Sequence, residues 1–299
     1  MGAGLQRMRC FAKVNLGLQV TGRRDDGLHD LRSVLHTIDL HDTLEYRPAA
    51  GLSLRVTCEG MASGTGPADG PDNLVLRAAA AAGLEGGEFT LTKRIPAGAG
   101  LGGGSSDAAA TLLAVRPDLE MGELHRIAAG LGSDVPFFLY GGACLALGRG
   151  DEIYPLPEQT DLHLALAFPG HSLSTPEVYR AWDDSLTSAR NPGRVNDFAA
   201  WSGAGGDGIP GIANDLEEAA IRIRPSLKDL RSALERSGAR AVAMTGSGSA
   251  FFGIFDDARS AKEGARRVGE AGFTATAVRS ISRAERDREV RERQSRDAD

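Results

Sequence analysis

The chain has 299 residues and a formal net charge of −6 at neutral pH. It is long enough for one large domain or two smaller ones with substantial cores. The acidic balance argues against a general nucleic-acid-binding protein, which would show a basic patch or stripe. Cys10, Cys58 and Cys144 are odd in number and form no CxxC pair, which indicates a reducing compartment without a disulfide framework. No apolar run approaches the ~20 residues of a membrane span. We therefore expect a cytoplasmic protein with neither a membrane nor a nucleic-acid partner.

The first sixty residues are predicted to be rich in strands, because short segments alternate apolar and polar residues. A helix with Asp72 or Asn73 near its N-cap follows these strands. Next come another extended segment, a glycine-rich loop and two further helices. The expected strands are 9–20, 32–40, 43–47, 52–58 and 89–95, and the expected helices are 73–84, 105–115 and 121–131.

The second half is predicted to be a separate unit of mixed strands and helices. Residues 185–210 are polar, rich in glycine and poorly patterned, which predicts a mobile loop. The densely charged tail predicts a solvated, partly helical or disordered terminus. The expected strands are 141–147, 162–168, 240–244, 250–255 and 274–281, and the expected helices are 175–182, 216–237 with a break before Pro225, and 258–271. We place one domain at 1–158 and a second at 159–282, followed by the tail 283–299.

The most informative segment is the loop from Pro96 to Ser106, between an apolar strand and an alanine-rich helix. Glycine permits positive φ and lets a ligand approach the backbone closely. The helix start directs unpaired N–H groups at the loop, which predicts a phosphate site. No Gly-Lys-Ser/Thr closes the loop as in a Walker A sequence, and no βαβ unit with an acidic residue about twenty positions on surrounds it as in a dinucleotide site. A flexible linker is disfavoured by the flanking strand and helix.

Two further segments place polar side chains in conspicuous positions. Lys13 and Asn15 share one face of an otherwise apolar strand. Burying them is costly unless they are paired, and a structural salt bridge and an active-site role are equally consistent with the pattern. Asp134 precedes Pro136 and two aromatic residues. Taken alone, an aspartate in that position is most often a cap or turn residue.

A histidine and a small-residue loop complete the candidates. His29 lies in a polar turn, where a lone histidine is more often solvated than functional. The segment Thr245–Ser249, Thr-Gly-Ser-Gly-Ser, is either an ordinary hairpin turn or a second phosphate-facing concavity of backbone N–H groups.

Taken together, these segments resemble the GHMP small-molecule kinases. The Leu-Gly-Gly-Gly-Ser-Ser-Asp stretch marks the superfamily. The Lys13, His29 and Asp134 segments are similar to those of members that phosphorylate a diphosphocytidyl sugar alcohol for isoprenoid biosynthesis. A mevalonate or homoserine kinase is the runner-up, and a non-catalytic sugar-nucleotide sensor is a more distant alternative. The motifs that carry the resemblance are 12–16 (Ala-Lys-Val-Asn-Leu), 27–29 (Gly-Leu-His), 96–106, 132–138 (Gly-Ser-Asp-Val-Pro-Phe-Phe) and 244–248 (Met-Thr-Gly-Ser-Gly).

The resemblance implies an α+β fold with the active site between two halves. The N-terminal half would resemble domain 2 of ribosomal protein S5, and the C-terminal half would be ferredoxin-like. The reaction would transfer the γ-phosphoryl group of ATP to the 2-hydroxyl of the sugar alcohol, with Mg²⁺ as cofactor. Ser105 or Ser106 could contact the metal, although no carboxylate pair with metal-ligand spacing is visible. A monomer or weak homodimer is expected.

On that resemblance, Asp134 is the expected general base and Lys13 the cation beside it, which would favour the ionised carboxylate and the developing alkoxide. The loop would wrap the ATP phosphates, with Asn73 near the adenosine. The expected nucleotide-binding residues are Asn73, Pro96, Ala97, Gly98, Ala99, Gly100, Leu101, Gly102, Gly103, Gly104, Ser105 and Ser106.

The cytidine would be held by His29 at the cytosine edge and by an aromatic sandwich. Tyr179 matches one aromatic of the sandwich, but Leu28 stands where the other is expected. This departure predicts weaker cytidine binding or compensation by another aromatic residue, since stacking is worth ~1–3 kcal/mol per base. The expected substrate-binding residues are Asn15, Leu28, His29, Tyr179, Thr245 and Gly246.

Overall fold

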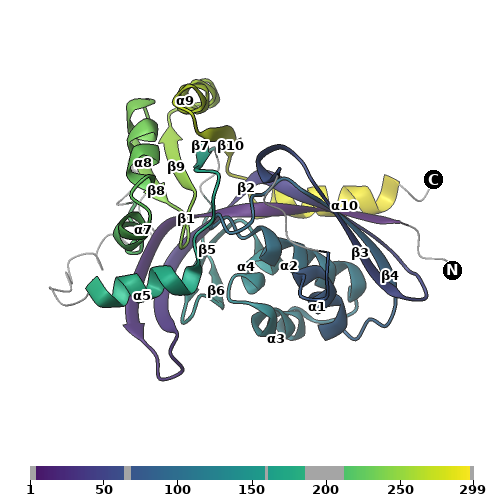
Figure 1. Ribbon diagram of the computed structural model, residues 1–299. Coiled ribbons are helices and arrows are strands. Elements are labelled where there is room, and N and C mark those ends of the chain that lie inside the picture. The colour runs from purple at the N-terminus through teal and green to yellow at the C-terminus, as the bar shows by residue number, and fades with distance from the viewer. Residues whose placement is uncertain (1–4, 64–68, 159–160, 186–211, 297–299) are drawn as a thin grey trace.

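The computed structural model describes residues 5–63, 69–158, 161–185 and 212–296. Within those ranges, the first half of the chain forms a six-stranded sheet around a long hairpin (Figure 1). β1 (Gln6–Arg23) and β2 (His29–Arg47) pair antiparallel along nearly their whole length. β3 pairs with β4 in parallel, whereas the other pairs of this sheet are antiparallel. The remaining strands are β3 (Leu52–Cys58), β4 (Gly87–Lys93), β5 (Ala143–Leu147) and β6 (Glu152–Pro155), and the order is β3-β4-β2-β5-β6.

Helices cover one face of this sheet (Figure 1). Alanine side chains of α1 and α2 pack against Phe89 and Leu91 of β4 and against Met8 of β1. Because alanine is small, the two helices can lie close to the strands and to one another, and it costs no side-chain entropy in a helix. The helices of this layer are α1 (Leu74–Ala81), α2 (Gly103–Val115), α3 (Met121–Leu131) and α4 (Val135–Tyr140), and the short 3₁₀ helix η1 (Gly60–Ala62) follows β3.

The second half of the chain forms its own antiparallel sheet, of four strands among the described residues, in the order β10-β7-β9-β8. Apolar side chains of its helices pack on one face of the sheet. Its strands are β7 (His163–Phe168), β8 (Ala241–Met244), β9 (Phe251–Phe255) and β10 (Thr274–Arg279). Its helices are α5 (Thr175–Ser185), α7 (Glu217–Ile223), α8 (Leu227–Arg236) and α9 (Ala258–Glu270). Two sheets with helices against them confirm the α+β class.

The hairpin joins the two halves. Leu18 of β1 donates its N–H to the carbonyl of Ala213 at 2.9 Å and accepts from the N–H of Asp215 at 3.0 Å. A shared apolar cluster lies between the halves, with Val14 and Ile38 on one side and Phe252 on the other. Burial at this junction fixes the position of the hairpin, whose end lies beside α5 (Figure 1).

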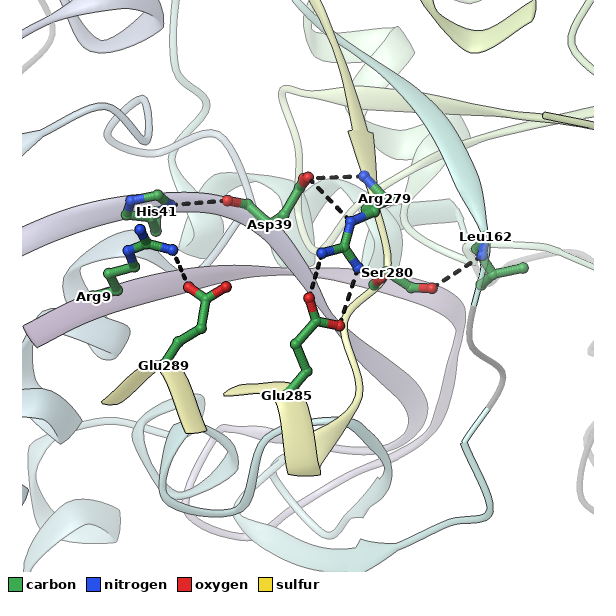
Figure 2. A network of polar contacts seen from close by, with 8 residues as sticks. All are labelled: Arg9, Asp39, His41, Leu162, Arg279, Ser280, Glu285 and Glu289. Atoms are coloured by element: carbon green, nitrogen blue, oxygen red, sulfur yellow. Dashed lines mark hydrogen bonds and ion pairs between the residues drawn. The ribbon is translucent and has the colours of Figure 1, made fainter. Parts of the chain in front are cut away.

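The charged tail forms a helix that docks on the body of the protein. α10 (Arg283–Arg296) runs beside β1, and its Glu289 forms an ion pair with Arg9 (Figure 2). Glu285 accepts from the Arg279 guanidinium at 3.1 Å, and Asp39 accepts from the backbone N–H of Arg279 at 3.0 Å. The first turns of α10 are therefore held by both halves of the protein, whereas the sequence predicts a solvated terminus.

The same helix contacts the end of α4. Arg286 donates to the carbonyls of Phe138 and Leu139, the latter at 3.4 Å. Arg283 donates to the carbonyls of Gly141 and Ala143 at 3.2 and 3.1 Å. The last carbonyls of a helix lack intrahelical partners and carry partial negative charge, so these guanidinium groups stabilise the end of α4.

Two short elements are not predicted from the sequence. These are the strand β6 and the helix α4, and both are too brief to show a period. The break before Pro225 separates α7 from α8 as expected. The predicted loop 185–210 lies, apart from Ser185 at the end of α5, outside the described residues. No helix in the part of the chain that the structure describes is long and apolar enough to cross a membrane.

Candidate active site

A cavity of about 770 Å³ opens between the glycine loop, the hairpin and α5. Residues from both halves of the chain line it, so the fold brings together segments that are far apart in sequence. The predicted site residues that line the cavity are the loop residues 96–105, Lys13, Asn15, Leu28, His29, Asp134, Tyr179 and Gly246. Asn73, Ser106 and Thr245 lie outside the lining.

The glycine loop has the backbone conformation that its sequence predicts. Gly98, Gly100 and Gly102 have φ values of +63°, +77° and +72°, in the left-handed region that side chains disfavour. A Cβ on Gly102 would lie 2.6 Å from the ring of Phe138. Gly102 is also the N-cap of α2, which therefore begins at Gly103, two residues before the predicted start.

Both halves of the protein hold this loop. The carbonyl of Leu101 accepts from the N–H of Lys13 at 3.0 Å, and that of Ala99 accepts from the N–H of Ala250 at 3.1 Å. No side chain caps the start of α2, and Gly103, Gly104 and Ser105 line the cavity. The start of the helix therefore faces the cavity, which is the arrangement that binds phosphate.

Lys13 and Asn15 form a buried polar pair. Lys13, which is 2% exposed, donates from Nζ to Asn15 Oδ1 at 2.6 Å. Asn15 Oδ1 also accepts from the Thr245 hydroxyl at 3.1 Å, and its Nδ2 donates to Ser33 Oγ at 2.7 Å. Ser33 and Thr245 therefore fix the orientation of the amide that accepts from the ammonium. Thr245 is fully buried, so it contacts Asn15 and does not line the cavity itself.

Asp134 lies opposite this pair. Its Oδ2 is 3.5 Å from Lys13 Nζ, and 41% of its side chain is exposed. Asp134 occupies the N-cap position of α4, but its side chain makes no capping hydrogen bond to that helix. The carboxylate is therefore free of the cap role that its sequence position suggests, and it shares the cavity with Lys13.

His29 is the first residue of β2 and is buried rather than solvated. Its ring stacks on Tyr179, with centroids 4.8 Å apart and planes 23° apart, and packs at right angles to Trp182, with centroids 5.6 Å apart. Burial raises the pKa of Tyr179, and the nearby Asp134 carboxylate adds to the rise. Leu28 is 45% exposed and lines the cavity beside them.

Sequence reasoning missed Trp182 and Asp183, which contact His29. Asp183 Oδ1 lies 2.8 Å from His29 Nε2. Both residues follow Tyr179 at the helical spacings of three and four positions, which place side chains on the same face of α5. That spacing is the signal that could have identified them.

A buried ionic cluster beneath the glycine loop was also missed. Lys93 Nζ donates to Asp107 Oδ2 at 2.6 Å and to Asp42, and a Cβ on Gly103 would lie 3.1 Å from the same ammonium. Burial raises the pKa of Asp107 to about 7, Lys93 opposes this rise, and Asp42 adds to it. Although burial lowers the pKa of Lys93, the two carboxylates together raise it above its ordinary value.

Comparisons with known proteins identify the family of the chain. The model of the GHMP kinases N terminal domain matches residues 73–142, and that of the GHMP kinases C terminal domain matches residues 185–273. The 4-diphosphocytidyl-2-C-methyl-D-erythritol kinase of Moorella thermoacetica is 40% identical over an aligned length of 272 residues, and the match covers 87% of this chain and 93% of that protein.

Solved structures extend the comparison. A crystal structure of 4-(cytidine 5'-diphospho)-2C-methyl-D-erythritol kinase is 37% identical, with a TM-score of 0.74 over 92% of this chain and 99% of that one. Homoserine kinase from Cytophaga hutchinsonii is 18% identical, with a TM-score of 0.66 over 93% of this chain and 95% of that one, and shares the fold alone. The chain is therefore a GHMP kinase and belongs to the 4-diphosphocytidyl-2-C-methyl-D-erythritol kinase family.

Proposed function

We propose that the protein transfers the γ-phosphoryl group of ATP to the 2-hydroxyl of 4-diphosphocytidyl-2-C-methyl-D-erythritol. The observation that carries this proposal is that Lys13 and Asp134 line the same cavity as the glycine loop, 3.5 Å apart. Relatives of about this length, at 37–40% identity, are named for that kinase, which supports the choice of substrate over mevalonate or homoserine.

The nucleotide would lie along the glycine loop. Backbone N–H groups at the start of α2 would bind the phosphates, with the positive end of the helix dipole behind them. Asn73 caps α1 through its Oδ1, which accepts from the N–H of Val75 at 3.0 Å, and its neighbour Leu74 lines the cavity. These positions support a place for the adenosine beside the start of α1.

In the proposed reaction, Asp134 accepts the proton of the 2-hydroxyl as that oxygen attacks the γ-phosphorus. Lys13 stabilises the negative charge that develops on the oxygen. Asn15 fixes the ammonium, so its position is set before the substrate arrives. Phosphoryl transfer depends mostly on positioning and charge neutralisation, and this pair with a phosphate cradle supplies both.

Mg²⁺ would neutralise charge on the phosphate oxygens. The described residues contain no group of three histidine, cysteine, aspartate or glutamate side chains that could hold a metal ion. This fits a cation bound largely by phosphates and water, as is usual for Mg²⁺. Ser105 lines the cavity at the start of α2, and its hydroxyl is the side-chain group that we propose as the protein ligand of Mg²⁺.

The cytidine would lie at the end of the hairpin. His29, Leu28 and Tyr179 line this part of the cavity, and Gly246 lines the side nearer Lys13. Because the face of Tyr179 already stacks on His29, we propose that the base lies beside the histidine ring and against the remaining surface of Tyr179.

The test is phosphoryl transfer from ATP to this substrate by the wild type, by Asp134→Asn and by Asp256→Asn. Asp256 is an exposed carboxylate whose ion pair with Arg240 lies at 3.0 Å, and it is the control. We expect turnover by the wild type and the control, and a kcat lower by ~10²–10⁴-fold in Asp134→Asn.

The other outcomes separate the claims. If Asp134→Asn retains the wild-type kcat, the kinase stands but the base is wrong. If the wild type phosphorylates mevalonate or homoserine and leaves the cytidine substrate unchanged, the proposed substrate is wrong.

A further inference from the structure

Asp183 of α5 faces the end of the hairpin. Its Oδ1 lies 2.8 Å from His29 Nε2, and its Oδ2 lies 3.8 Å from Arg23 Nη1. Arg23 and His29 are directly paired across β1 and β2. One carboxylate from the C-terminal half therefore spans the last paired residues of the hairpin, and only 7% of the His29 side chain is exposed.

This contact sets the hydrogen-bonding character of the His29 ring. A carboxylate only accepts hydrogen bonds, so Nε2 must carry the proton that it donates to Asp183. In a neutral imidazole one ring nitrogen donates and the other accepts. With Nε2 protonated, Nδ1 is the acceptor.

The ring is also fixed in orientation. Tyr179 stacks on its face and Trp182 packs at right angles to it, with planes 89° apart. Within the described part of the chain no group hydrogen-bonds Nδ1, and His29 lines the cavity. The described residues thus leave Nδ1 as an acceptor without a protein donor, on a ring of fixed orientation that lines the cavity.

An acceptor at this place distinguishes the two common pyrimidines. Cytosine has an exocyclic amino group, a donor, where the corresponding position of a uracil-type base has a carbonyl oxygen, an acceptor. The amino group can donate to Nδ1, whereas the carbonyl oxygen would face its lone pair. Sites built to hydrogen-bond one group reject an analogue that lacks it much more strongly than apolar pockets reject a change in size.

We propose that Asp183 is a specificity-determining residue that holds His29 as an Nδ1 acceptor and thereby selects cytosine over uracil in the diphosphate substrate. This proposal rests on the proposed function, which supplies the cytidine diphosphate substrate. Asp183 acts through His29 and does not touch the reacting atoms. Its loss should therefore change binding and leave the chemical step nearly unaltered.

The first experiment measures the affinities of CDP and UDP by calorimetry for the wild type, Asp183→Ala and Asp184→Asn. Asp184 is the exposed neighbour, outside the cavity lining, and serves as the matched control. We expect the wild type and control to prefer CDP by on the order of 10²-fold, and Asp183→Ala to lose about tenfold of that preference. With the full substrate, KM should rise in Asp183→Ala while kcat stays near that of the wild type. An unchanged preference in Asp183→Ala overturns the proposal.

The second experiment reads the tautomer directly, from ¹⁵N chemical shifts of the histidine side chains in the wild type with CDP bound. We expect His29 protonated at Nε2 alone, and protonation at Nδ1 overturns the proposal whatever the variant does. The two claims remain separable. A wild type that prefers CDP but phosphorylates no cytidine substrate contradicts the proposed function alone. A wild type that turns over the substrate without preferring CDP contradicts this inference alone.

Discussion

Gly100 lies against the backbone of Thr245 so closely that a Cβ on Gly100 would be 2.1 Å from the Thr245 carbonyl oxygen. In return, the Thr245 hydroxyl lies 3.1 Å from the carbonyl oxygen of Gly100, and its one proton is shared between that oxygen and Asn15 Oδ1. The glycine loop of one half is thus fastened to the strand connection of the other, and the missing side chain makes that contact possible.

Gly100→Ala should therefore damage both the loop and the junction. The new methyl group meets fixed backbone, and the left-handed φ of this position costs a non-glycine residue ~1–2 kcal/mol in addition. We expect the free energy of unfolding to fall by more than ~2 kcal/mol and the KM for ATP to rise. Chemical denaturation and ATP titrations would measure both.

Gly130→Ala in α3 is the control. A Cβ on Gly130 meets open space, so the free energy of unfolding should rise by ~0.5–1 kcal/mol. A normal KM for ATP in Gly100→Ala would contradict this account of the loop.

Leu28→Tyr should strengthen binding of the cytidine substrate. Leu28 is 45% exposed and lines the cavity where an aromatic is expected from the family resemblance. An added stacking surface is worth ~1–3 kcal/mol per base, so KM should fall while kcat changes little. Steady-state kinetics at saturating ATP would test this. Met121→Tyr, at another exposed apolar position outside the cavity, should have no effect. An unchanged KM in Leu28→Tyr would place the base elsewhere.

Asp107 should make stability depend on pH below neutrality. Its pKa rises from the ordinary 3.8 to about 7 in the fold, mainly through burial. A raised folded-state pKa contributes stability that is fully present below pH 4 and is lost as the pH rises through 7. The wild type should therefore lose on the order of 3 kcal/mol relative to Asp107→Asn between pH 4 and pH 7.5.

Urea denaturation across this pH range would measure that difference. Asp118→Asn is the comparison, because the hydrogen bond from Arg116 lowers the pKa of Asp118. The Asp118 contribution has the opposite sign, being present above its unfolded pKa and lost as the pH falls. A pH-independent difference between the wild type and Asp107→Asn would show that Asp107 does not titrate in this range.

Arg286→Met should loosen the helix that carries Asp134. The guanidinium of Arg286 donates to the carbonyls of Phe138 and Leu139 at the end of α4, and hydrogen bonds to charged groups are worth ~1.5–3 kcal/mol. We expect the free energy of unfolding to fall by about that amount, with a lower kcat and an unchanged KM for ATP. Arg288→Met, on the exposed side of α10, should match the wild type in thermal melts and kinetics. A stable Arg286→Met enzyme with full kcat would separate α10 from the active site.

The sequence was sufficient to predict the elements whose signals are local. The glycine loop was predicted from residue types alone, because glycine adopts positive φ values such as those at Gly98, Gly100 and Gly102 without steric cost. The alternation of Leu52–Cys58 and the break before Pro225 were predicted for equally local reasons. Lys13 and Asn15 were placed on one face of a strand by the period of two alone.

Features that depend on long-range contact were not predictable in this way. His29 lies in a segment that resembles a solvated turn, and it is buried because Tyr179 and Trp182 arrive from about 150 residues later in the chain. Similarly, the ionic cluster of Lys93 requires Asp42, which sits on a different strand. The docking of α10 depends on which carbonyls its arginines reach, and charge density carries no such information.

The docking of α10 has a consequence for synthesis on the ribosome. Domains usually fold in order as the chain emerges, the N-terminal one first. Here the end of α4 and the flank of β1, both made early, contact residues that are translated 148 and 280 positions later. Until α10 has emerged from the ribosome, the carbonyls of Phe138 and Leu139 therefore lack the guanidinium partner that they have in the folded protein. Nascent chains that stop short of residue 283 carry every proposed site residue, but not the helix that secures the end of α4.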